Sequence, residues 1–275
     1  MTKHIAYLGP IGTFTEQAAL LYDSNAELTP LTSVLSVADA VHKGAVEEGV
    51  VPIENSLQGS VPDTLDLLIH DTTLMISREI IIPIELCLMV KPNTKKQEVE
   101  VVYSHPNALG QCRKYLDEQY YGAIQIASLS TAAAVEDMLG SGKPAAAIGN
   151  TRSADIYGVK ILDKGIQDNK ANHTRFVVLS KADHEPTGSD KTSLCFSFGG
   201  DQAGMLYSVL ACFAERNINL AKVESRPNKA GLGGYVFLLD VEGHREDDNV
   251  RWALEQMHDK VSSVKLFGSY PKYVY

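Results

Sequence analysis

The residues best suited to chemistry lie together in the stretch Asn172-His173-Thr174-Arg175-Phe176. A threonine hydroxyl is a poor acid, but it can donate a hydrogen bond to a leaving oxygen. An arginine guanidinium can bind a carboxylate through two parallel hydrogen bonds. The stretch is therefore a candidate site for an anionic small molecule, in which Thr174 can donate a hydrogen bond and Arg175 can hold a carboxylate.

Strand geometry makes it difficult for Thr174 and Arg175 to contact the same ligand. Neighbouring side chains of an extended strand point to opposite faces, so Thr174 and Arg175 reach one ligand only if the strand bends or a cleft wraps its end. The alternative is that Arg175 pairs with Glu54 or an aspartate and braces the cleft. Phe176 is a candidate substrate contact, although packing is the more ordinary role for such a ring.

Two neutral amides, Asn55 and Gln111, stand at the predicted ends of a strand and a helix. Amides of this kind orient hydroxyl or carboxylate oxygens, which makes both residues catalytic candidates. The alternatives are turn capping for Asn55 and a solvated helix face for Gln111. His105 invites an acid–base role, but its place in a turn before Pro106 favours a structural one.

Hydroxyl side chains mark several predicted helix starts, at Thr13, Ser104, Ser130 and Thr131. A hydroxyl there caps the helix, and the same geometry aims backbone amides at an anion, so both roles can hold. We take Ser104 as a catalytic candidate and the other three as substrate-binding candidates. Ser56 either binds substrate or caps its own loop.

These candidates must be positioned by alternating strands and helices over the first 181 residues. Predicted strands lie at 5–8, 49–53, 74–77, 80–90, 99–103, 124–127, 145–148 and 174–179, with predicted helices between most of them. Such alternation predicts parallel sheets covered by helices, here as two doubly wound α/β lobes. Ligands of such sheets bind beyond the carboxyl ends of the strands, so we expect one cleft between the lobes.

The pattern changes after a polar linker at 182–191 that contains Pro186 and Gly188. From residue 192 to 275 the predicted order is strand, helix, strand, strand, helix, strand, which is the ferredoxin-like βαββαβ order. Its elements are expected at 193–198, 202–216, 220–225, 235–241, 247–260 and 264–267, with a Gly-rich turn from Gly231 to Gly234.

Composition bounds the function. The 275 residues suit about two domains, and the formal net charge of -9 argues against nucleic acid or an anionic membrane as the main partner. Four cysteines without a C-x-x-C pair fit a reducing compartment, and no signal peptide or membrane span is evident, so a cytoplasmic location is expected. The dinucleotide-binding, P-loop and nucleophile-elbow motifs are absent.

Five stretches in order resemble the prephenate dehydratase family. They are Val51-Pro52-Ile53-Glu54-Asn55-Ser56 followed by Gly59, Tyr103-Ser104-His105-Pro106 with Gln111-Cys112, Ser130-Thr131-Ala132-Ala133-Ala134, Ala147-Ile148-Gly149-Asn150 with Tyr157-Gly158, and the stretch 172–176. The resemblance implies a periplasmic-binding-protein-like catalytic region and a hydro-lyase that converts prephenate to phenylpyruvate, with Thr174 as the essential hydroxyl. It implies no cofactor and no metal. Since no chorismate mutase segment precedes Met1, the monofunctional form is expected.

The C-terminal segment resembles the ACT regulatory domain of the same enzymes, which implies feedback inhibition by L-phenylalanine in a homodimer or homotetramer. The effector-binding residues that the resemblance implies are Gly204, Met205, Leu206, Asn217, Asn219, Leu220, Glu224, Ser225 and Arg226. For the two asparagines the alternative is turn formation after a helix. The family usually has alanine where Met205 stands, and a larger side chain there either narrows the effector pocket or points away.

Two other functions stay open at this level. An arogenate dehydratase performs the same reaction on the amino analogue and differs by one pocket contact. A two-lobed, amino-acid-responsive binding protein would have the lobes without catalysis, but it would leave residues 172–176 without a role.

Overall fold

The computed structural model describes residues 2–228 and 234–273. The predicted Gly-rich turn falls largely on residues 231–233, which lie outside the described residues. By its internal contacts the chain divides into two compact units. The first comprises Met1–Val37, Val50–Val61 and Ile81–Phe176, and the second comprises Ala38–Gly49, Pro62–Ile80 and Val177–Tyr275. The division does not follow a single point in the sequence.

The first sheet is built around the N-terminal strand, with strand order β2-β1-β3-β11-β5 and β4 paired to β3. Its elements are β1 (His4–Leu8), α1 (Phe14–Tyr22), β2 (Glu27–Leu31), α2 (Val34–His42), β3 (Glu48–Asn55), β4 (Gly59–Ser60), α3 (Pro62–Asp66), the π-helix η1 (Leu67–Asp71), β5 (Met75–Pro83) and β11 (His173–Ser180). The edge strand β2 was not predicted, because it contains Pro30 and shows no buried alternation.

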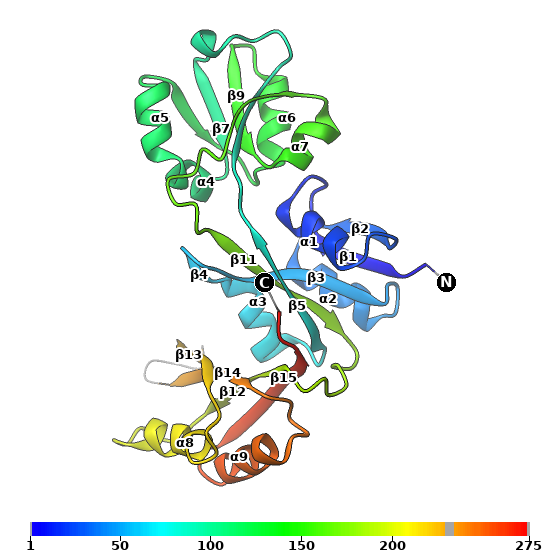
Figure 1. Cartoon of the computed structure of the whole chain (residues 1–275), viewed down its shortest axis with the longest axis vertical. Coiled ribbons are helices and arrows are strands. Elements are labelled where there is room, and N and C mark those ends of the chain that lie inside the picture. The colour runs from blue at the N-terminus through cyan, green and yellow to red at the C-terminus, as the bar shows by residue number, and fades with distance from the viewer. Residues whose placement is uncertain (1, 229–233, 274–275) are drawn as a thin grey trace. The chain divides into compact units, whose positions relative to one another are not determined.

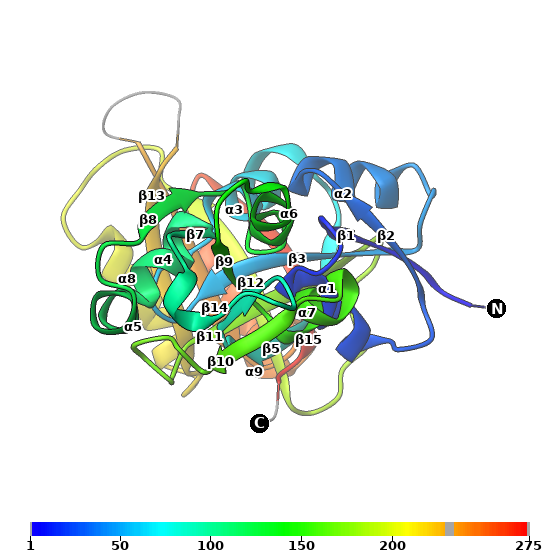
Figure 2. The ribbon, with the colours of Figure 1, turned by 90° about the horizontal axis from the view of Figure 1, so that it is seen from above.

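The second sheet has the strand order β10-β6-β9-β7-β8. Its elements are β6 (Cys87–Val90), the short helix η2 (Lys96–Glu98), β7 (Val101–Ser104), α4 (Pro106–Gln111), α5 (Arg113–Gln119), β8 (Ile124–Ala127), α6 (Ala133–Gly140), β9 (Ala145–Gly149), α7 (Thr151–Tyr157) and β10 (Lys160–Lys164). Figures 1 and 2 show α4 and α5 on one side of this sheet and α6 and α7 on the other. The helices cover both faces, as the alternation predicts.

The expectation of a parallel sheet holds only for part of this second sheet. β7 runs parallel to β8 and β9, but β6 is antiparallel to β9 and β10 is antiparallel to β6. The reason is that the chain enters and leaves this sheet through β6 and β10. The predicted single strand 80–90 is accordingly two strands, since the chain passes between the sheets at 84–86. There Ile84 donates its backbone N–H to the Asn172 carbonyl.

The C-terminal elements form a four-stranded antiparallel sheet with the order β13-β14-β12-β15. They are β12 (Asp190–Ser197), α8 (Met205–Ala214), β13 (Leu220–Pro227), β14 (Tyr235–Glu242), α9 (Asp248–His258) and β15 (Ser263–Pro271). The helices α8 and α9 lie side by side on one face of the sheet (Figure 1) and pack on a core that includes Phe196, Phe213 and Met257. The ferredoxin-like prediction is confirmed.

Within the second unit, the segment 62–80 is held to the C-terminal elements by charged groups. The buried ammonium of Lys191 on β12 lies 2.8 Å from a carboxylate oxygen of Glu79 on β5. Lys265 on β15 donates to the backbone carbonyls of Ile69 and Thr72, at 3.2 and 2.7 Å. Because Glu79 is almost fully buried, loss of Lys191 would leave a buried carboxylate without this partner, so the contact fixes the segment firmly.

Candidate active site

A cavity of about 240 Å³ in the first unit gathers most of the predicted site residues. Seven of them line it: Thr13, Asn55, Gln111, Ser130, Thr131, Thr174 and Phe176. They come from both sheets: α1, β3 and β11 belong to the first, whereas α4 and the segment before α6 belong to the second. Elements of both sheets therefore line this one cavity of the first unit.

A continuous chain of side-chain amides joins Gln111 to Thr174. The Gln111 Oε1 atom accepts from Asn172 Nδ2 at 2.7 Å, and the Asn172 Oδ1 atom accepts from Asn55 Nδ2 at 2.8 Å. The same Asn55 amide donates to the Thr174 hydroxyl oxygen at 2.9 Å. Asn55 is itself fixed, because its Oδ1 accepts the backbone N–H groups of Leu57 and Gln58.

This chain decides which atoms face a ligand. Since Asn55 donates to the Thr174 oxygen, the Thr174 hydroxyl proton is free to be donated elsewhere, and Thr174 lines the cavity. Since the Gln111 oxygen is taken by Asn172, the Gln111 N–H groups are left as donors toward the same cavity. The site is thus an arrangement of pre-oriented donors, which suits stabilisation of negative charge that develops on an oxygen.

Helix starts supply the electrostatics of the cavity. The Thr13 hydroxyl accepts from the Glu16 N–H at the start of α1, and the Ser130 hydroxyl accepts from the Ala133 N–H at the start of α6. The capping role predicted for Thr13 and Ser130 is confirmed. The Glu16 carboxylate accepts the Gly12 backbone N–H, one residue before the Thr13 cap.

Among the described residues that line the cavity there is no Lys, Arg, Asp or Glu. Positive potential there comes instead from the helix starts, because each helix N-terminus is equivalent to about half a positive charge. An anion whose charges lie near the starts of α1 and α6 matches this arrangement, and no counter-ion has to be desolvated.

His105 caps the third helix that starts at the cavity. Its Nδ1 accepts the Asn107 N–H at 3.2 Å, and the ring lines the cavity. Burial lowers the pKa of His105 below its ordinary value of 6.5. Ser104, which was predicted as a possible cap of this helix, is not the cap: its hydroxyl donates to the Ile148 carbonyl at 2.8 Å, it is fully buried, and it does not line the cavity.

Ser56 also lies outside the lining of the cavity. Its hydroxyl accepts the His173 N–H at 2.9 Å and donates to the Ala171 carbonyl at 3.2 Å. These bonds hold the β3–β4 turn against the start of β11, so Ser56 fixes the strand that carries Thr174. The loop-fixing alternative describes its geometry better than direct binding.

Arg175 points away from the cavity that its neighbour lines. Its Nη1 atom lies 3.5 Å from Glu54 Oε2, and its side chain is mostly buried. This is the bracing arrangement that strand alternation favours, with Thr174 and Arg175 on opposite faces of β11. Phe176 lines the cavity and is almost fully buried, which fits packing in its wall.

If Arg175 braces the strand, Arg175→Met and Glu54→Gln should each lower the free energy of unfolding by about 1 kcal/mol, because Glu54 is partly exposed. The Michaelis constant should change less than about twofold, since neither side chain lines the cavity. Denaturant unfolding and steady-state kinetics measure the two effects. A several-fold rise in the Michaelis constant with unchanged stability would instead establish Arg175 as a carboxylate ligand.

Several residues of the site were not predicted. Asn172 lay in the motif stretch but was given no role, and the structure places it, fully buried, between Asn55 and Gln111. Gln58 and Asn107 also line the cavity and are joined by a 2.9 Å hydrogen bond. The signal for Asn172 was its presence in the motif; no local pattern indicates a bond between residues so far apart in sequence.

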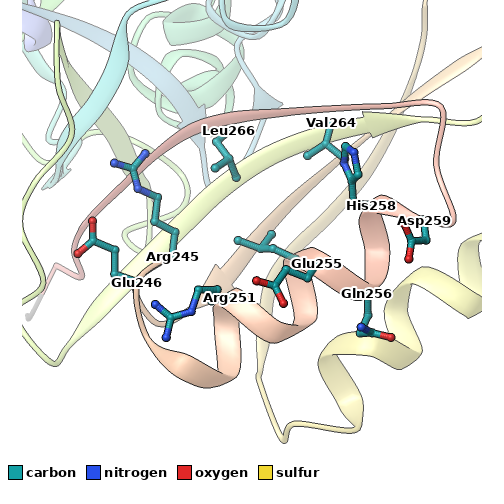
Figure 3. Close-up of a pocket in the computed structure, with 10 residues that line it drawn as sticks. Arg245, Glu246, Arg251, Glu255, Gln256, His258, Asp259, Val264 and Leu266 are labelled. Atoms are coloured by element: carbon teal, nitrogen blue, oxygen red, sulfur yellow. The ribbon is translucent and has the colours of Figure 1, made fainter.

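A larger cavity of about 730 Å³ lies in the C-terminal domain beside α9 and β15 (Figure 3). Val264 and Leu266 of β15 contribute apolar surface to it. The guanidinium groups of Arg245 and Arg251 also line it, and each is paired with an aspartate. None of the predicted site residues lines this cavity, so its size does not make it a candidate active site.

Another cavity of about 470 Å³ holds part of the predicted effector site. Gly204, Met205 and Leu206 line it at the start of α8, together with the aromatic rings of Phe198, Tyr207, Tyr235 and Phe237. The methionine that departs from the family pattern is therefore in the wall of this cavity.

Three further predicted effector residues, between the end of α8 and the start of β13, lie away from this cavity. Asn217 has a φ of 55° and donates its N–H to the Ala214 carbonyl, which is the turn-forming alternative. The Asn219 carbonyl accepts from Glu242 N, and Leu220 packs against the domain core. None of the three lines the cavity.

The edge strand β13 presents its two faces differently. Ser225 is paired in register with Phe237, a residue of the cavity wall, so its side chain lies on the cavity side of the sheet. Glu224 and Arg226 alternate to the opposite face, where Arg226 lies 3.3 Å from the Asp66 carboxylate of α3 and 4.0 Å from Glu224. The strand thus joins the edge of the cavity to the segment 62–80.

Neither a membrane-spanning helix nor a metal-binding cluster is found among the described residues. None of their helices has both the length and the apolar character needed to cross a membrane. No group of three or more His, Cys, Asp or Glu side chains in residues 2–228 and 234–273 is arranged to hold a metal ion.

Comparisons with known proteins identify the chain's relatives. Family profiles match prephenate dehydratase over residues 5–184 and the ACT domain over residues 197–259. A bifunctional chorismate mutase/prephenate dehydratase of Aquifex aeolicus (strain VF5) is 42% identical over 98% of this chain and 73% of its own length. A prephenate dehydratase of Bacillus subtilis (strain 168) is 36% identical over 98% of this chain and 99% of its own.

A solved structure of a prephenate dehydratase has a similar fold over nearly the whole chain. A prephenate dehydratase from Arthrobacter aurescens in complex with L-Phe superposes with a TM-score of 0.91 at 34% identity, over 98% of this chain and 90% of that one. The resemblance that the five stretches and the C-terminal signatures indicated is confirmed. The chain belongs to the prephenate dehydratase family and carries an ACT domain.

Proposed function

We propose that the protein is a carbon–oxygen lyase that converts prephenate to phenylpyruvate in phenylalanine biosynthesis. The reaction expels the ring carboxylate as carbon dioxide and the ring hydroxyl as hydroxide, and the ring becomes aromatic. One observation carries the proposal. Thr174, with its oxygen occupied by Asn55, offers its proton to a cavity that contains no charged side chain among the described residues and that three helices open onto.

The chain's own residues account for the steps. The starts of α1 and α6 attract the carboxylates of the dianion through the helix dipoles and through the backbone N–H groups that the Thr13 and Ser130 caps do not occupy. Thr174 donates its hydrogen bond to the departing hydroxyl, and the Gln111 N–H groups donate to an oxygen of the same substrate. Because aromatisation drives the reaction, oriented donors are sufficient and no strong acid is needed.

The direct test is incubation of the purified protein with prephenate, followed by ultraviolet detection of phenylpyruvate. Turnover establishes a dehydratase, whereas prephenate binding without turnover would establish the two-lobed binding protein instead. Comparison of kcat/KM for prephenate and arogenate decides between the two substrates. We propose prephenate, because the cavity shows no described carboxylate that would pair with the ammonium group of arogenate.

We also propose that L-phenylalanine inhibits the enzyme at the cavity next to α8. Its wall of aromatic rings suits a phenyl side chain, and α8, β13 and β14 around it each expose a large apolar residue. The exposed residues are Tyr207, Val223 and Tyr235, at 77%, 48% and 50%. Such a patch favours a homodimer or homotetramer in which a second ACT domain covers the effector.

Replacement of Ser225 should weaken inhibition without altering turnover. Ser225→Ala should raise the phenylalanine concentration for half inhibition about tenfold, since one hydrogen bond to a charged ligand is worth about 1.4 kcal/mol. Neither Ser225 nor Asn219 is in the cavity lining, but Ser225 is paired with the wall residue Phe237, whereas Asn219 lies in the turn after α8. Asn219→Ala is therefore the matched comparison. Inhibition curves at fixed prephenate measure both, and a larger effect of Asn219→Ala would move the effector site to the end of α8.

The domain organisation that we propose is a catalytic domain at 1–181, a linker at 182–191 and an ACT domain at 192–275. The family profiles support it, because they match residues 5–184 and 197–259, and the break between the two matches covers most of this linker. The contacts of Lys191 and Lys265 with the segment 62–80 indicate that deletion of the ACT domain would also destabilise that segment. A cytoplasmic location is proposed from the four cysteines, which are buried and unpaired.

A further inference from the structure

His105 is set apart from the other residues around the catalytic cavity. Among the described residues that line the cavity it is the only one whose side chain can gain or lose a proton in the ordinary pH range. The proposed mechanism does not use it. His105 directly precedes α4, the helix that ends at Gln111.

The backbone fixes the tautomer of the ring. Nδ1 accepts the Asn107 N–H at 3.2 Å, so Nδ1 carries a lone pair and the neutral ring carries its proton on Nε2. Protonation of Nδ1 would place two donors against each other and would put a positive charge at the start of a helix, both of which are unfavourable. Burial, which lowers the pKa of His105, acts in the same direction.

The Nε2–H group is left available. Among the described residues, no second hydrogen bond to this ring is found. The Nε2 atom is not fully buried, so it can be reached by a ligand. His105 lines the cavity together with Asn107 and Gln111 of α4. An N–H donor with no protein partner, in a cavity that already presents Thr174 and Gln111 as donors, has a ligand oxygen as its natural acceptor.

We propose that His105 is a further substrate-contacting residue, in which the Asn107 amide fixes the imidazole as an Nε2–H donor to an oxygen of the bound dianion. This inference rests on the proposed dehydratase function and deepens it. A neutral imidazole donates without adding a second positive charge, so it stabilises substrate oxygens without an acid that titrates near neutral pH. No proton leaves the ring in this role.

Two substitutions separate the donor from the helix cap. The amide of His105→Asn places its oxygen at the position of Nδ1 and keeps the cap, since asparagine is among the best N-cap residues, but it removes the donor. The longer amide of His105→Gln places an N–H at the position of Nε2 but gives up the cap. His42→Asn, at the exposed end of α2, serves as the matched control.

The experiment measures kcat/KM for prephenate and the thermal midpoint for the full-length wild type and the three variants. We expect His105→Asn to lose about 10- to 100-fold in kcat/KM with an unchanged midpoint, which is the cost of one hydrogen bond to a charged group. We expect His105→Gln to stay within about threefold of the wild type and to lower the midpoint, through loss of the cap. His42→Asn should match the wild type in both.

The remaining outcomes overturn the proposal. Wild-type kcat/KM in His105→Asn would show that the ring only caps α4. Equal losses in both His105 variants, each with a lowered midpoint, would show that the ring only packs. Absence of turnover in the wild type itself would overturn the proposed function, and this inference with it, so the two failures are told apart by the wild-type measurement.

Discussion

Thr174→Ala is expected to lower kcat for prephenate by about 10²- to 10³-fold, the usual effect of removing one donor that stabilises developing negative charge. The Thr174 hydroxyl oxygen is taken by Asn55 at 2.9 Å, so its proton is the donor that alanine lacks. Substrate binding should be less affected, because the starts of α1 and α6 are untouched. Stopped-time assays of phenylpyruvate and a calorimetric titration with an unreactive analogue separate the two effects.

Thr174→Ser is the matched control. It keeps the hydroxyl and the hydrogen bond from Asn55 and removes only a methyl group, so kcat should fall less than about tenfold. Thr174→Val keeps the shape and removes the hydroxyl, and it should behave like alanine. An unchanged kcat in both the alanine and the valine variants would remove Thr174 from the chemistry and leave Gln111 as the principal donor.

Asn172→Asp is the second change with a large expected effect. Asn172 is fully buried, donates to Gln111 and accepts from Asn55. Aspartate has the same shape but no donor, so its carboxylate would face the Gln111 oxygen and turn that amide away from its orientation. We expect kcat/KM to fall by at least about 10²-fold and the free energy of unfolding to fall by about 3 kcal/mol, because a buried charge is left without a counter-ion.

The same chemical change at Asn169 provides the control. Asn169 is exposed, and its Oδ1 accepts the Ala171 N–H at 2.9 Å, a bond that aspartate keeps. Asn169→Asp should therefore preserve both activity and stability. If Asn172→Asp kept wild-type kcat/KM, the amide chain from Gln111 to Thr174 would be ruled out as the device that orients the donors.

The fold was largely predictable because its signals are local. Thr13 and Ser130 were predicted as helix caps from residue type and spacing, and both accept the expected N–H groups. The βαββαβ order of the C-terminal domain followed from the period of apolar residues. The antiparallel placement of β6 and β10 was not predictable, because pairing partners far apart in sequence leave no mark on either strand alone.

The candidate site divides in the same way. The kind of chemistry could be predicted from the sequence, because a hydroxyl, two amides and a set of helix starts suit an anion, and the resemblance of the five stretches implies loss of a leaving group. The sequence also determined that Thr174 and Arg175 would oppose each other, because strand alternation is a local rule.

Which of these residues line the cavity depends on the tertiary fold. In the fold, Arg175 pairs with Glu54, and the Ser104 hydroxyl donates to the Ile148 carbonyl. Asn172 lies between Asn55 and Gln111 and bonds to both. The physical reason is that a hydrogen bond consumes a specific lone pair or proton. The donors that remain for a substrate therefore depend on partners far away in the sequence. Asn55 and Thr174, for example, are more than a hundred residues apart, and no local sequence pattern specifies their contact.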